Sequence, residues 1–376
     1  MARRSDLHAL AVTRPGLEAL CADELAELGG SPGTPGPGIV GFTAPPRGVY
    51  AAARWSRTAT RILVVADRFR ARTFAQLEHG LAAVAWAAWV PVGATVEVRA
   101  RSERARLYHT GAIAQRVEAA VADAVGGAVG AGEGPDERVD VRIDVRIADD
   151  LATVRVDAVG ESLDRRGWRR DTAKAPLPPT VAAAALRTIG WDGTAPLLDP
   201  LCGSGTIPIE AVLIATGRPP TAGRPLALEA WPSFAPGTWA STAVTPVPPP
   251  PDPAGIWASD RDVGAVAATV ENAGRAGVGG GVVVAEASLS DSPATLPHGL
   301  PHGWIVTNPP WGRRIDGAGD LRDLYAALGH LAGRLGWRLA VLTASDALAG
   351  QIRPALTRRW QTRIAGEDVT LWASPG

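Results

Sequence analysis

The order of hydrophobic and polar positions predicts two small α+β units in the first 160 residues. In the first unit the expected order is strand, helix, strand, helix, strand, at residues 7–13, 15–28, 39–43, 47–55 and 61–70. In the second unit the order is helix, strand, helix, strand, strand, at residues 73–86, 94–101, 110–125, 139–147 and 151–159. We expect α+β domains at residues 1–71 and 72–160, the first with a split βαβ plan.

From residue 180 onward, short apolar strands alternate with helices, which is typical of a mostly parallel, doubly wound α/β sheet. The expected strands are residues 197–199, 256–259, 282–285, 304–307 and 337–342. The expected helices are residues 180–189, 206–215, 262–276, 321–335 and 346–357, with a closing hairpin at 363–364 and 369–372. A third domain is expected at 181–376, after a linker at 161–180 and with a Pro/Gly-rich insertion at 217–255.

Composition sets limits on what this chain can be. Its 376 residues are long for one core and suit two or three domains. The 46% of hydrophobic and 20% of charged residues are those of a soluble globular protein, and no apolar run is long enough to span a membrane. Two cysteines favour a reducing, cytoplasmic location, and the first residues lack the pattern of a secretory signal. The cysteines and six histidines show no metal-ligand spacing.

Residues 198–206 combine a strand end, a glycine turn and a helix start, which is typical of a small-molecule site. Gly203 and Gly205 let the backbone approach a ligand closely, and free N–H groups point out of the helix that begins at Thr206. A third glycine is missing, as is a phosphate-loop Gly-Lys pair, so neither common nucleotide motif is present. Asp199 at the strand tip suits a ligand with an amino group, and S-adenosylmethionine carries both an ammonium and a sulfonium group.

Two further strand tips carry acidic residues. Asp260 ends the second strand, where a carboxylate can accept hydrogen bonds from both ribose hydroxyls of an adenosyl group. The alternative is that Asp260 only caps the helix that begins at Asp262. Glu286 ends the third strand, where it either accepts a hydrogen bond from the adenine amine or is an ordinary surface residue.

The fourth strand ends in Asn308, Pro309, Pro310 and Trp311, which form the sharpest chemical signal in the chain. An exocyclic amine on a base is a weak nucleophile because its lone pair is delocalised into the ring. An Asn side-chain oxygen and a backbone carbonyl held rigid by prolines can accept the amine hydrogens and aim the lone pair at a methyl group. An aromatic side chain beside them can stack on the base. We expect these four residues to form the catalytic site of an amine methyltransferase.

Arginines interleaved with aromatic residues form two clusters that suit RNA. The first cluster consists of Arg101, Arg104, Arg106, Tyr108 and His109. The second lies in the linker and consists of Arg165, Arg166, Trp168, Arg169 and Arg170. Nearly all basic residues are arginine, which favours bidentate phosphate contacts. The formal net charge is zero, however, and the same arginines could pair with nearby acidic residues such as Asp164.

The glycine-turn and Asn-Pro-Pro-Trp motifs resemble those of class I S-adenosylmethionine-dependent amino methyltransferases. More narrowly, nearly the whole chain resembles the THUMP-domain RNA guanine-N2 methyltransferases. Residues 104–110 match the family's basic stretch before the THUMP helix, and residues 163–177 match its linker. The resemblance implies a ferredoxin-like domain, a THUMP domain and a Rossmann-like methyltransferase domain in that order. It also implies a structured RNA partner, and we expect no metal, no membrane association and no obligate protein partner.

The resemblance implies roles for individual residues. The residues that hold the cofactor would be Pro176, Asp199, Leu201, Cys202, Gly203, Ser204, Gly205, Thr206, Asp260, Arg261, Glu286, Ala287 and Asn308. Cys202 would line the cofactor site and would not attack the base. This chain has Trp311 where the family more often has Tyr, and Glu286 where Asp is usual.

The substrate is harder to define than the reaction. Residues 228–234 and 324–329 look most like the bacterial large-subunit rRNA branch, so a guanosine of 23S rRNA is the expected substrate. This guanine would leave its stack to reach Asn308. A tRNA acceptor-stem guanosine is the first alternative, because that branch shares every catalytic motif. N6 methylation of adenine in DNA or RNA and a non-catalytic RNA-binding scaffold are further alternatives.

Overall fold

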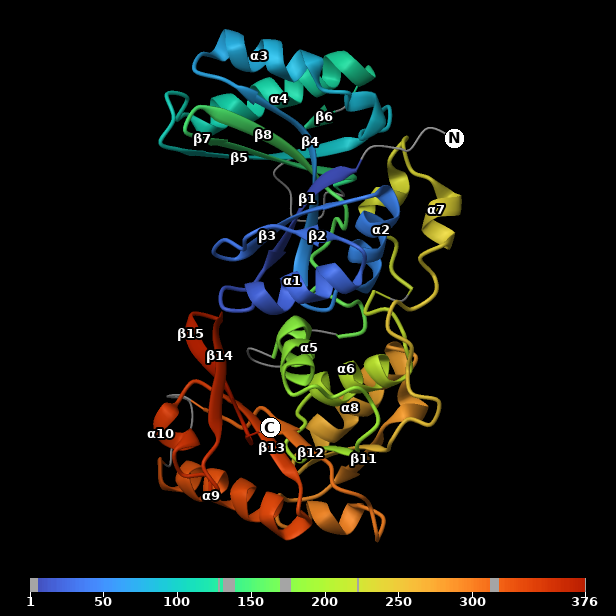
Figure 1. Cartoon of the computed structure of the whole chain (residues 1–376), viewed down its shortest axis with the longest axis vertical. Coiled ribbons are helices and arrows are strands. Elements are labelled where there is room, and N and C mark those ends of the chain that lie inside the picture. The colour runs from blue at the N-terminus through green and yellow to red at the C-terminus, as the bar shows by residue number, and fades with distance from the viewer. Residues whose placement is uncertain are drawn as a thin grey trace.

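The computed structural model describes residues 6–127, 129–130, 139–169, 177–221, 223–311 and 318–375. Figure 1 shows an elongated molecule in which an N-terminal and a C-terminal sheet follow one another along the long axis. This arrangement confirms the expected class, in which α+β units precede a doubly wound α/β domain.

The N-terminal sheet has eight strands in the order β2-β3-β1-β4-β8-β7-β5-β6. Its strands are β1 (Leu7–Thr13), β2 (Ser31–Pro32), β3 (Ile39–Ala44), β4 (Ala59–Arg70), β5 (Thr95–Glu103), β6 (Val129–Gly130), β7 (Val141–Ala148) and β8 (Leu151–Asp157). The helices of this part are α1 (Glu18–Glu27), α2 (Pro46–Trp55), α3 (Phe74–Ala83), the 3-10 turn η1 (Trp86–Ala88) and α4 (Thr110–Val125). Helices α3 and α4 cover one face of the β5, β7 and β8 strands (Figure 1).

Strand β4 belongs to both N-terminal domains. Its first half pairs antiparallel with β1 and its second half with β8, with a register shift between Val65 and Asp67. Ile62 and Val64 of β4 are buried in a hydrophobic cluster that contains residues of both domains. The two domains therefore share one sheet and one core.

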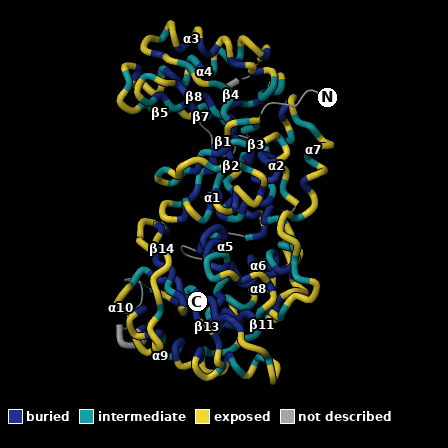
Figure 2. Tube along the Cα trace, in the orientation of Figure 1, coloured by how far each residue is buried: buried dark blue, intermediate teal, exposed yellow. Residues whose placement is uncertain are grey.

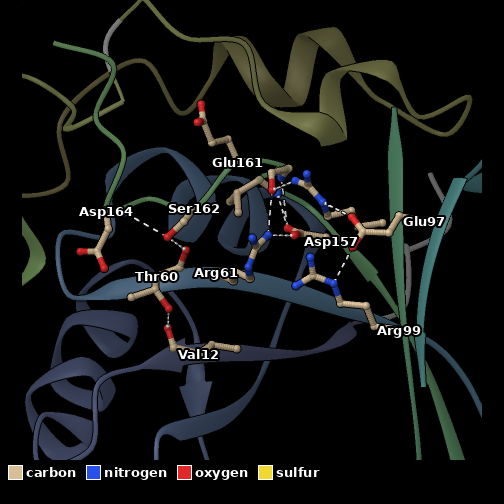
Figure 3. Close-up of polar contacts among 12 residues, drawn as sticks. Val12, Thr60, Arg61, Glu97, Arg99, Asp157, Glu161, Ser162 and Asp164 are labelled. Atoms are coloured by element: carbon tan, nitrogen blue, oxygen red, sulfur yellow. Dashed lines mark hydrogen bonds and ion pairs between the residues drawn. The ribbon is translucent and has the colours of Figure 1, made fainter. Parts of the chain in front are cut away.

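Polar contacts hold the start of the linker against this shared sheet (Figure 3). The Ser162 hydroxyl donates to the Thr60 carbonyl at 3.3 Å, and the Asp164 N–H donates to Ser162 Oγ at 3.3 Å. Beside them, Arg61 of β4 forms an ion pair with the buried carboxylate of Asp157 at the end of β8. These hydrogen bonds hold residues 162–164 of the linker against β4.

The C-terminal sheet has seven strands in the order β11-β10-β9-β12-β13-β15-β14. Its strands are β9 (Leu197–Asp199), β10 (Ile256–Asp260), β11 (Val283–Glu286), β12 (Trp304–Thr307), β13 (Arg338–Thr343), β14 (Thr357–Ile364) and β15 (Glu367–Ala373). Its helices and 3-10 turns are α5 (Pro179–Thr188), α6 (Thr206–Ala215), η2 (Ala227–Ala230), α7 (Pro236–Ala240), α8 (Val263–Arg275), η3 (Gly279–Gly281), η4 (Ser292–Thr295), α9 (Ala318–Leu335) and α10 (Asp346–Ala349).

Neighbouring strands of this sheet run parallel, except that β15 runs antiparallel to β13 and β14. Five of the six residues of β13 are buried, as Figure 2 shows for the middle of this domain. From β9 the chain builds the sheet in one direction through β10 and β11, and then in the other through β12 and β13. In an open sheet, the crevice at such a switch point is where ligands bind.

Two predicted features differ from the structure. The helix predicted at 346–357 is a single turn, α10, because Gly350 and Pro354 follow and proline lacks the N–H that a helix needs. The closing hairpin is longer than predicted, since β14 and β15 begin at Thr357 and Glu367.

The insertion at 217–255 reaches back from the C-terminal domain to the N-terminal domains, and α7 lies beside α2 (Figure 1). Trp231 packs edge-on against Trp89, with ring centroids 5.0 Å apart. The Arg54 guanidinium of α2 lies over the Trp239 ring, 3.6 Å from its centroid. Through these contacts the insertion packs against both N-terminal domains.

Candidate functional site

The carboxyl ends of β9, β10 and β12 meet at the switch point and bring three predicted residues together. Asp199 ends β9, Asp260 ends β10, and Asn308 follows β12. The Thr307 hydroxyl donates to Asp199 Oδ1 at 2.7 Å, and the Gly203 N–H donates to Asp260 Oδ2 at 3.0 Å. The strand tips and the glycine turn therefore form one connected site.

Asp199 is a buried carboxylic acid with few partners. Its side chain accepts hydrogen bonds from the Thr307 hydroxyl and from the Leu201 N–H, the latter at 3.2 Å. Burial raises the pKa of Asp199 to about 7, against the effect of these hydrogen bonds, and the charge of Asp260 adds to the rise. Because ionising Asp199 is costly without a partner, a cationic ligand beside it would be strongly favoured.

Helix α8 holds the glycine turn in place. Gly203 and Gly205 have φ angles of 54° and 81°, in the left-handed region that favours glycine. A Cβ on Gly205 would lie 2.8 Å from the methyl carbon of Thr269, so the turn has no room for one. The buried Thr269 hydroxyl donates to the Gly203 carbonyl at 2.8 Å, and the buried Asn272 amide donates to the Ser204 carbonyl at 2.9 Å.

Thr269 and Asn272 were not among the residues predicted from the sequence. The available signal was their spacing, because residues three apart on a helix lie on the same face. Both are polar and lie on a helix otherwise rich in Ala and Val. A pair of polar residues on the buried face of such a helix needs partners, and here the partners are the carbonyls of the glycine turn.

Asp260 is not the N-cap of α8. Asp262 holds that position, and its side chain accepts from the Gly264 N–H at 2.8 Å. Asp260 instead accepts from the Gly203 and Asp262 N–H groups, each at 3.0 Å. The capping alternative for Asp260 is therefore wrong, and its carboxylate lies between the glycine turn and the end of β10.

Other predicted cofactor residues surround this turn. Cys202 is buried, and burial raises the pKa of its thiol, which therefore stays protonated. Thr206 begins α6 and is buried. Arg261 and Glu286 are exposed, and the Ala287 N–H donates to the Asp260 carbonyl at 3.0 Å. A protonated Cys202 agrees with a lining role, since the thiolate is the reactive form.

The four residues after β12 form a turn that is partly exposed. Pro309 is buried and Pro310 is exposed, with Asn308 and Trp311 half-buried on either side. The Trp311 indole N–H donates to Asn308 Oδ1 at 3.1 Å. The acceptor atom that the sequence analysis assigned to the substrate amine is thus bonded to the neighbouring indole in this structure.

The linker cluster differs from its prediction. Arg166 is 3% exposed and forms an ion pair with buried Glu210 of α6, with Nε and Oε1 3.0 Å apart. It also donates to the Leu163 and Arg57 carbonyls at 3.0 Å each. Trp168 is 4% exposed and packs in the C-terminal core. The expectation of RNA contacts is therefore corrected for Arg166 and Trp168, because neither side chain reaches the surface.

The other linker residues lie nearer the surface. Arg165 is exposed and pairs with Glu161 at 3.1 Å. Arg169 Nη2 donates to Thr206 Oγ1 at 2.7 Å, which joins the linker to the start of α6. The predicted residues Arg170 and Pro176 lie outside the described residues.

The predicted cluster in the second domain is exposed. Its exposed side chains are Arg101, Arg104, Arg106, Tyr108 and His109. The Tyr108 side chain is 68% exposed, and its ring lies 4.2 Å from that of His109. Arg104 is paired with Glu103 at 2.6 Å and with Asp149 at 3.0 Å. Acidic neighbours therefore offset part of the positive charge of this cluster.

Arg68 and Arg146 extend this cluster across the same sheet and were not among the predicted residues. Thr153 of β8 lies opposite Arg68 of β4 on one side and Arg146 of β7 on the other, and Arg146 lies opposite Arg101 of β5. The alternating residues of β7, such as Val145, are buried in the core, so the arginines lie on the opposite face. The period-two alternation of β7 could have shown that its arginines share one face. The pairing of β7 with its neighbouring strands could not be read from the sequence.

Among the residues that the structure describes, no group of three or more His, Cys, Asp or Glu side chains could hold a metal ion. Within the same ranges, no helix has both the length and the apolar character needed to cross a membrane. The polar groups at the switch point are instead carboxylates, an amide and backbone N–H groups.

Three family models match successive parts of the chain. They are the RlmL ferredoxin-like domain over residues 8–63, the THUMP domain over 71–157 and the RMKL-like methyltransferase domain over 166–367. A ribosomal RNA large subunit methyltransferase K/L of Syntrophotalea carbinolica is 34% identical over 90% of this chain and 49% of its own length. The chain therefore spans about half the length of that relative.

Two further likenesses extend over nearly the whole chain. A Synechocystis protein provisionally named as an RNA methyltransferase is 29% identical, over 96% of each chain. The crystal structure of SMU.472, provisionally described as a methyltransferase and complexed with SAH, has a TM-score of 0.83 at 25% identity. It covers 99% of each chain. The ferredoxin-like, THUMP and methyltransferase order expected from the sequence is confirmed.

Proposed function

Because the chain belongs to the RMKL-like methyltransferase family, whose domain model spans more than half of its residues, we propose that it methylates the exocyclic N2 of a guanosine in RNA. The methyl donor is S-adenosylmethionine, and the proposed substrate is 23S rRNA. The observation that carries the proposal is the meeting of Asp199, Asp260 and Asn308 at one switch point.

The residues around the glycine turn fit the methyl donor. Asp199 suits its ammonium group, and Asp260 suits the ribose hydroxyls. A Cβ added to Gly203 would meet no heavy atom within 4 Å, so the space in front of this residue is open to a ligand. Glu286 and Ala287, at the end of β11, are the proposed adenine contacts. When bound, the cofactor supplies the methyl group on a cationic sulfur.

The turn after β12 supplies the acceptor side. Asn308 Oδ1 and the carbonyl of the following proline would accept the two hydrogens of the guanine amine. This holds the lone pair in line with the methyl group, so the rate gain comes from orientation. Trp311 would stack on the base once its indole N–H leaves Asn308.

The N-terminal half supports an RNA substrate. It matches a THUMP domain, and its exposed arginines include Arg68, Arg101 and Arg106, with the half-buried Arg146 beside Arg101. A relative of about twice this length is named a ribosomal RNA large subunit methyltransferase K/L. These observations favour rRNA over the tRNA alternative, although the catalytic turn would serve both.

The substrate is tested by incubating the protein with radiolabelled S-adenosylmethionine and with separated 23S rRNA, 16S rRNA and tRNA. We expect label in 23S rRNA, and nucleoside analysis of that RNA should yield N2-methylguanosine. Label in tRNA alone would establish the tRNA alternative. N6-methyladenosine in any pool would overturn the guanine assignment.

The acceptor role is tested with Asn308→Ala. We expect methyl transfer to fall by about a hundredfold or more, because the amine lone pair is no longer oriented. The dissociation constant for S-adenosylhomocysteine, measured by calorimetry, should change little. Equal losses in methyl transfer and cofactor binding would contradict the assigned role. Asn272→Ala serves for comparison, because it alters an amide beside the glycine turn and should weaken the binding of S-adenosylhomocysteine.

A further inference from the structure

Tyr325 is a buried tyrosine of α9 that touches the proposed acceptor turn. Its side chain is fully buried, and its Oη lies 3.4 Å from the Pro310 carbonyl oxygen and 2.8 Å from Thr343 Oγ1. Thr343 ends β13 and is also buried. Its hydroxyl oxygen accepts from the Ser345 N–H at 3.1 Å. A line of hydrogen-bonding groups thus runs from the end of β13 to the turn.

The Tyr325 hydroxyl is placed to donate to either oxygen, and one arrangement of hydrogens satisfies every group in this line. A tyrosine hydroxyl has one hydrogen, so Tyr325 can donate to Pro310 or to Thr343 but not to both. If Tyr325 donates to Pro310, then Thr343 donates to Tyr325 and Ser345 donates to Thr343. Each hydroxyl then donates once and accepts once, and the Pro310 carbonyl has a donor. Burial raises the pKa of Tyr325, so its hydroxyl keeps the hydrogen at neutral pH.

We propose that Tyr325 is a positioning residue for methyl transfer, because its hydroxyl, oriented by Thr343, fixes the Pro310 carbonyl and with it the turn that receives the base. The inference rests on the proposed role of that turn. Only Pro309 separates Asn308 from Pro310, and its ring restricts the backbone between them. A shift at Pro310 therefore moves Asn308, and small displacements of an orienting group reduce the rate strongly.

The decisive variant is Tyr325→Phe, which removes the hydroxyl and keeps the ring. We expect its single-turnover rate of methyl transfer to fall about tenfold. The dissociation constants for S-adenosylhomocysteine and RNA should change less than about twofold, because the variant leaves the cofactor turn and the arginines intact. A wild-type rate would overturn the inference, as would parallel losses in rate and cofactor binding.

The partner Thr343 gives an independent comparison. Thr343→Val removes its hydroxyl and should slow methyl transfer to a similar extent, whereas Thr343→Ser keeps the hydroxyl and should retain the rate. The double variant Tyr325→Phe/Thr343→Val should be no slower than Tyr325→Phe, because both changes break the same line of bonds. Additive losses would overturn the inference. This comparison decides the question even where the Phe variant folds poorly.

The matched control is Tyr50→Phe. Tyr50 is also buried, and its Oη accepts from the Ala235 N–H at 3.1 Å, between α2 and the insertion. This control should leave the single-turnover rate unchanged, and an equal loss there would overturn the inference. The activity of the wild-type protein distinguishes failure of the proposed function from failure of the proposed Tyr325 role. Absence of N2-methylguanosine with wild-type protein overturns both, whereas normal methylation by Tyr325→Phe overturns the positioning role alone.

Discussion

Asp199 connects the chemistry of one side chain to the pH dependence of the whole site. Burial raises its pKa from 3.8 to about 7 in the free protein. Below pH 7 a proton must therefore leave Asp199 before it can bind an ammonium group. We expect the affinity for S-adenosylhomocysteine to rise with pH, by up to about tenfold per unit below pH 7, and to level off above it. Calorimetric titrations between pH 5.5 and 8.5 measure this.

The control for this pH dependence is Asp199→Asn, which cannot ionise. It should bind the ligand more weakly and with little dependence on pH over the same range. Because the folded pKa lies above the unfolded value, the stability that protonated Asp199 contributes to the free protein is lost as the pH rises from 3.8 to about 7. A flat affinity profile for the wild-type protein would contradict the role assigned to Asp199.

Trp311 has a contact with a consequence for substrate affinity. Its indole N–H donates to Asn308 Oδ1 and would compete with the amine of the proposed guanine substrate for this atom. Trp311→Phe keeps an aromatic ring and removes this donor, and we expect the KM for RNA to fall about threefold with kcat nearly unchanged. Trp360→Phe, whose indole donates to Thr188 outside the turn, is the control. A higher KM for Trp311→Phe would mean that the indole is needed chiefly for stacking.

Single residues were predictable where their chemistry lies in one short segment. The placement of Asp199, Gly205 and Asn308 was predictable because a strand tip, a glycine turn and a proline pair can be recognised from neighbouring letters. Asn272 was missed because the carbonyl that it serves lies 68 residues earlier in the chain. Residues that are neighbours in the sequence reveal a motif that one segment forms alone. The role of a helix residue such as Asn272 depends on a distant partner, which the sequence does not show.

At the scale of elements, α8 supports the glycine turn, and this support can be removed. Asn272→Ala leaves the Ser204 carbonyl without its donor. We expect the affinity for S-adenosylhomocysteine to fall about tenfold, measured by calorimetry, because the turn loses its fixed orientation. Glu271→Ala changes an exposed residue of the same helix and should leave the affinity unchanged. Similar losses in both variants would indicate general weakening of α8.

Most elements were predictable because their periodicity is clear. The strands over 197–199 and 304–307 have the predicted limits, and those limits place Asp199 and Asn308 at the strand tips. The helix predicted at 346–357 was wrong because its apolar spacing continues past Gly350 while the backbone cannot continue past Pro354. The insertion gave no periodic signal, since its aromatic residues pack mainly against the N-terminal domains.

At the scale of the molecule, one buried ion pair joins the linker to the C-terminal domain and contacts the first domain. Arg166 pairs with Glu210 on α6, and Arg57 lies 3.7 Å from the same carboxylate. We expect Arg166→Ala to lower the free energy of unfolding by about 3 kcal/mol, because buried Glu210 then keeps only its longer contact with Arg57. Arg165→Ala, an exposed neighbour, should change it by less than about 0.5 kcal/mol.

Urea unfolding followed by far-UV circular dichroism measures both variants. These two variants also distinguish a structural arginine from an RNA-binding one. Arg165→Ala should reduce the salt dependence of RNA binding slightly without loss of stability. Equal stability of Arg166→Ala and wild type would contradict the buried pairing. Sequence reasoning grouped these two arginines because they are adjacent, whereas the fold turns one outward and the other inward.

The shared strand β4 bears on how this protein can be divided. The family models for its first two domains end at residue 63 and begin at 71, and β4 runs through the gap between them. A shortened chain that starts at the THUMP boundary loses β4 and exposes the edge of β8 to pairing with other molecules. A soluble THUMP fragment therefore has to begin before Ala59, and gene fusions that graft this module elsewhere have to carry β4 with it.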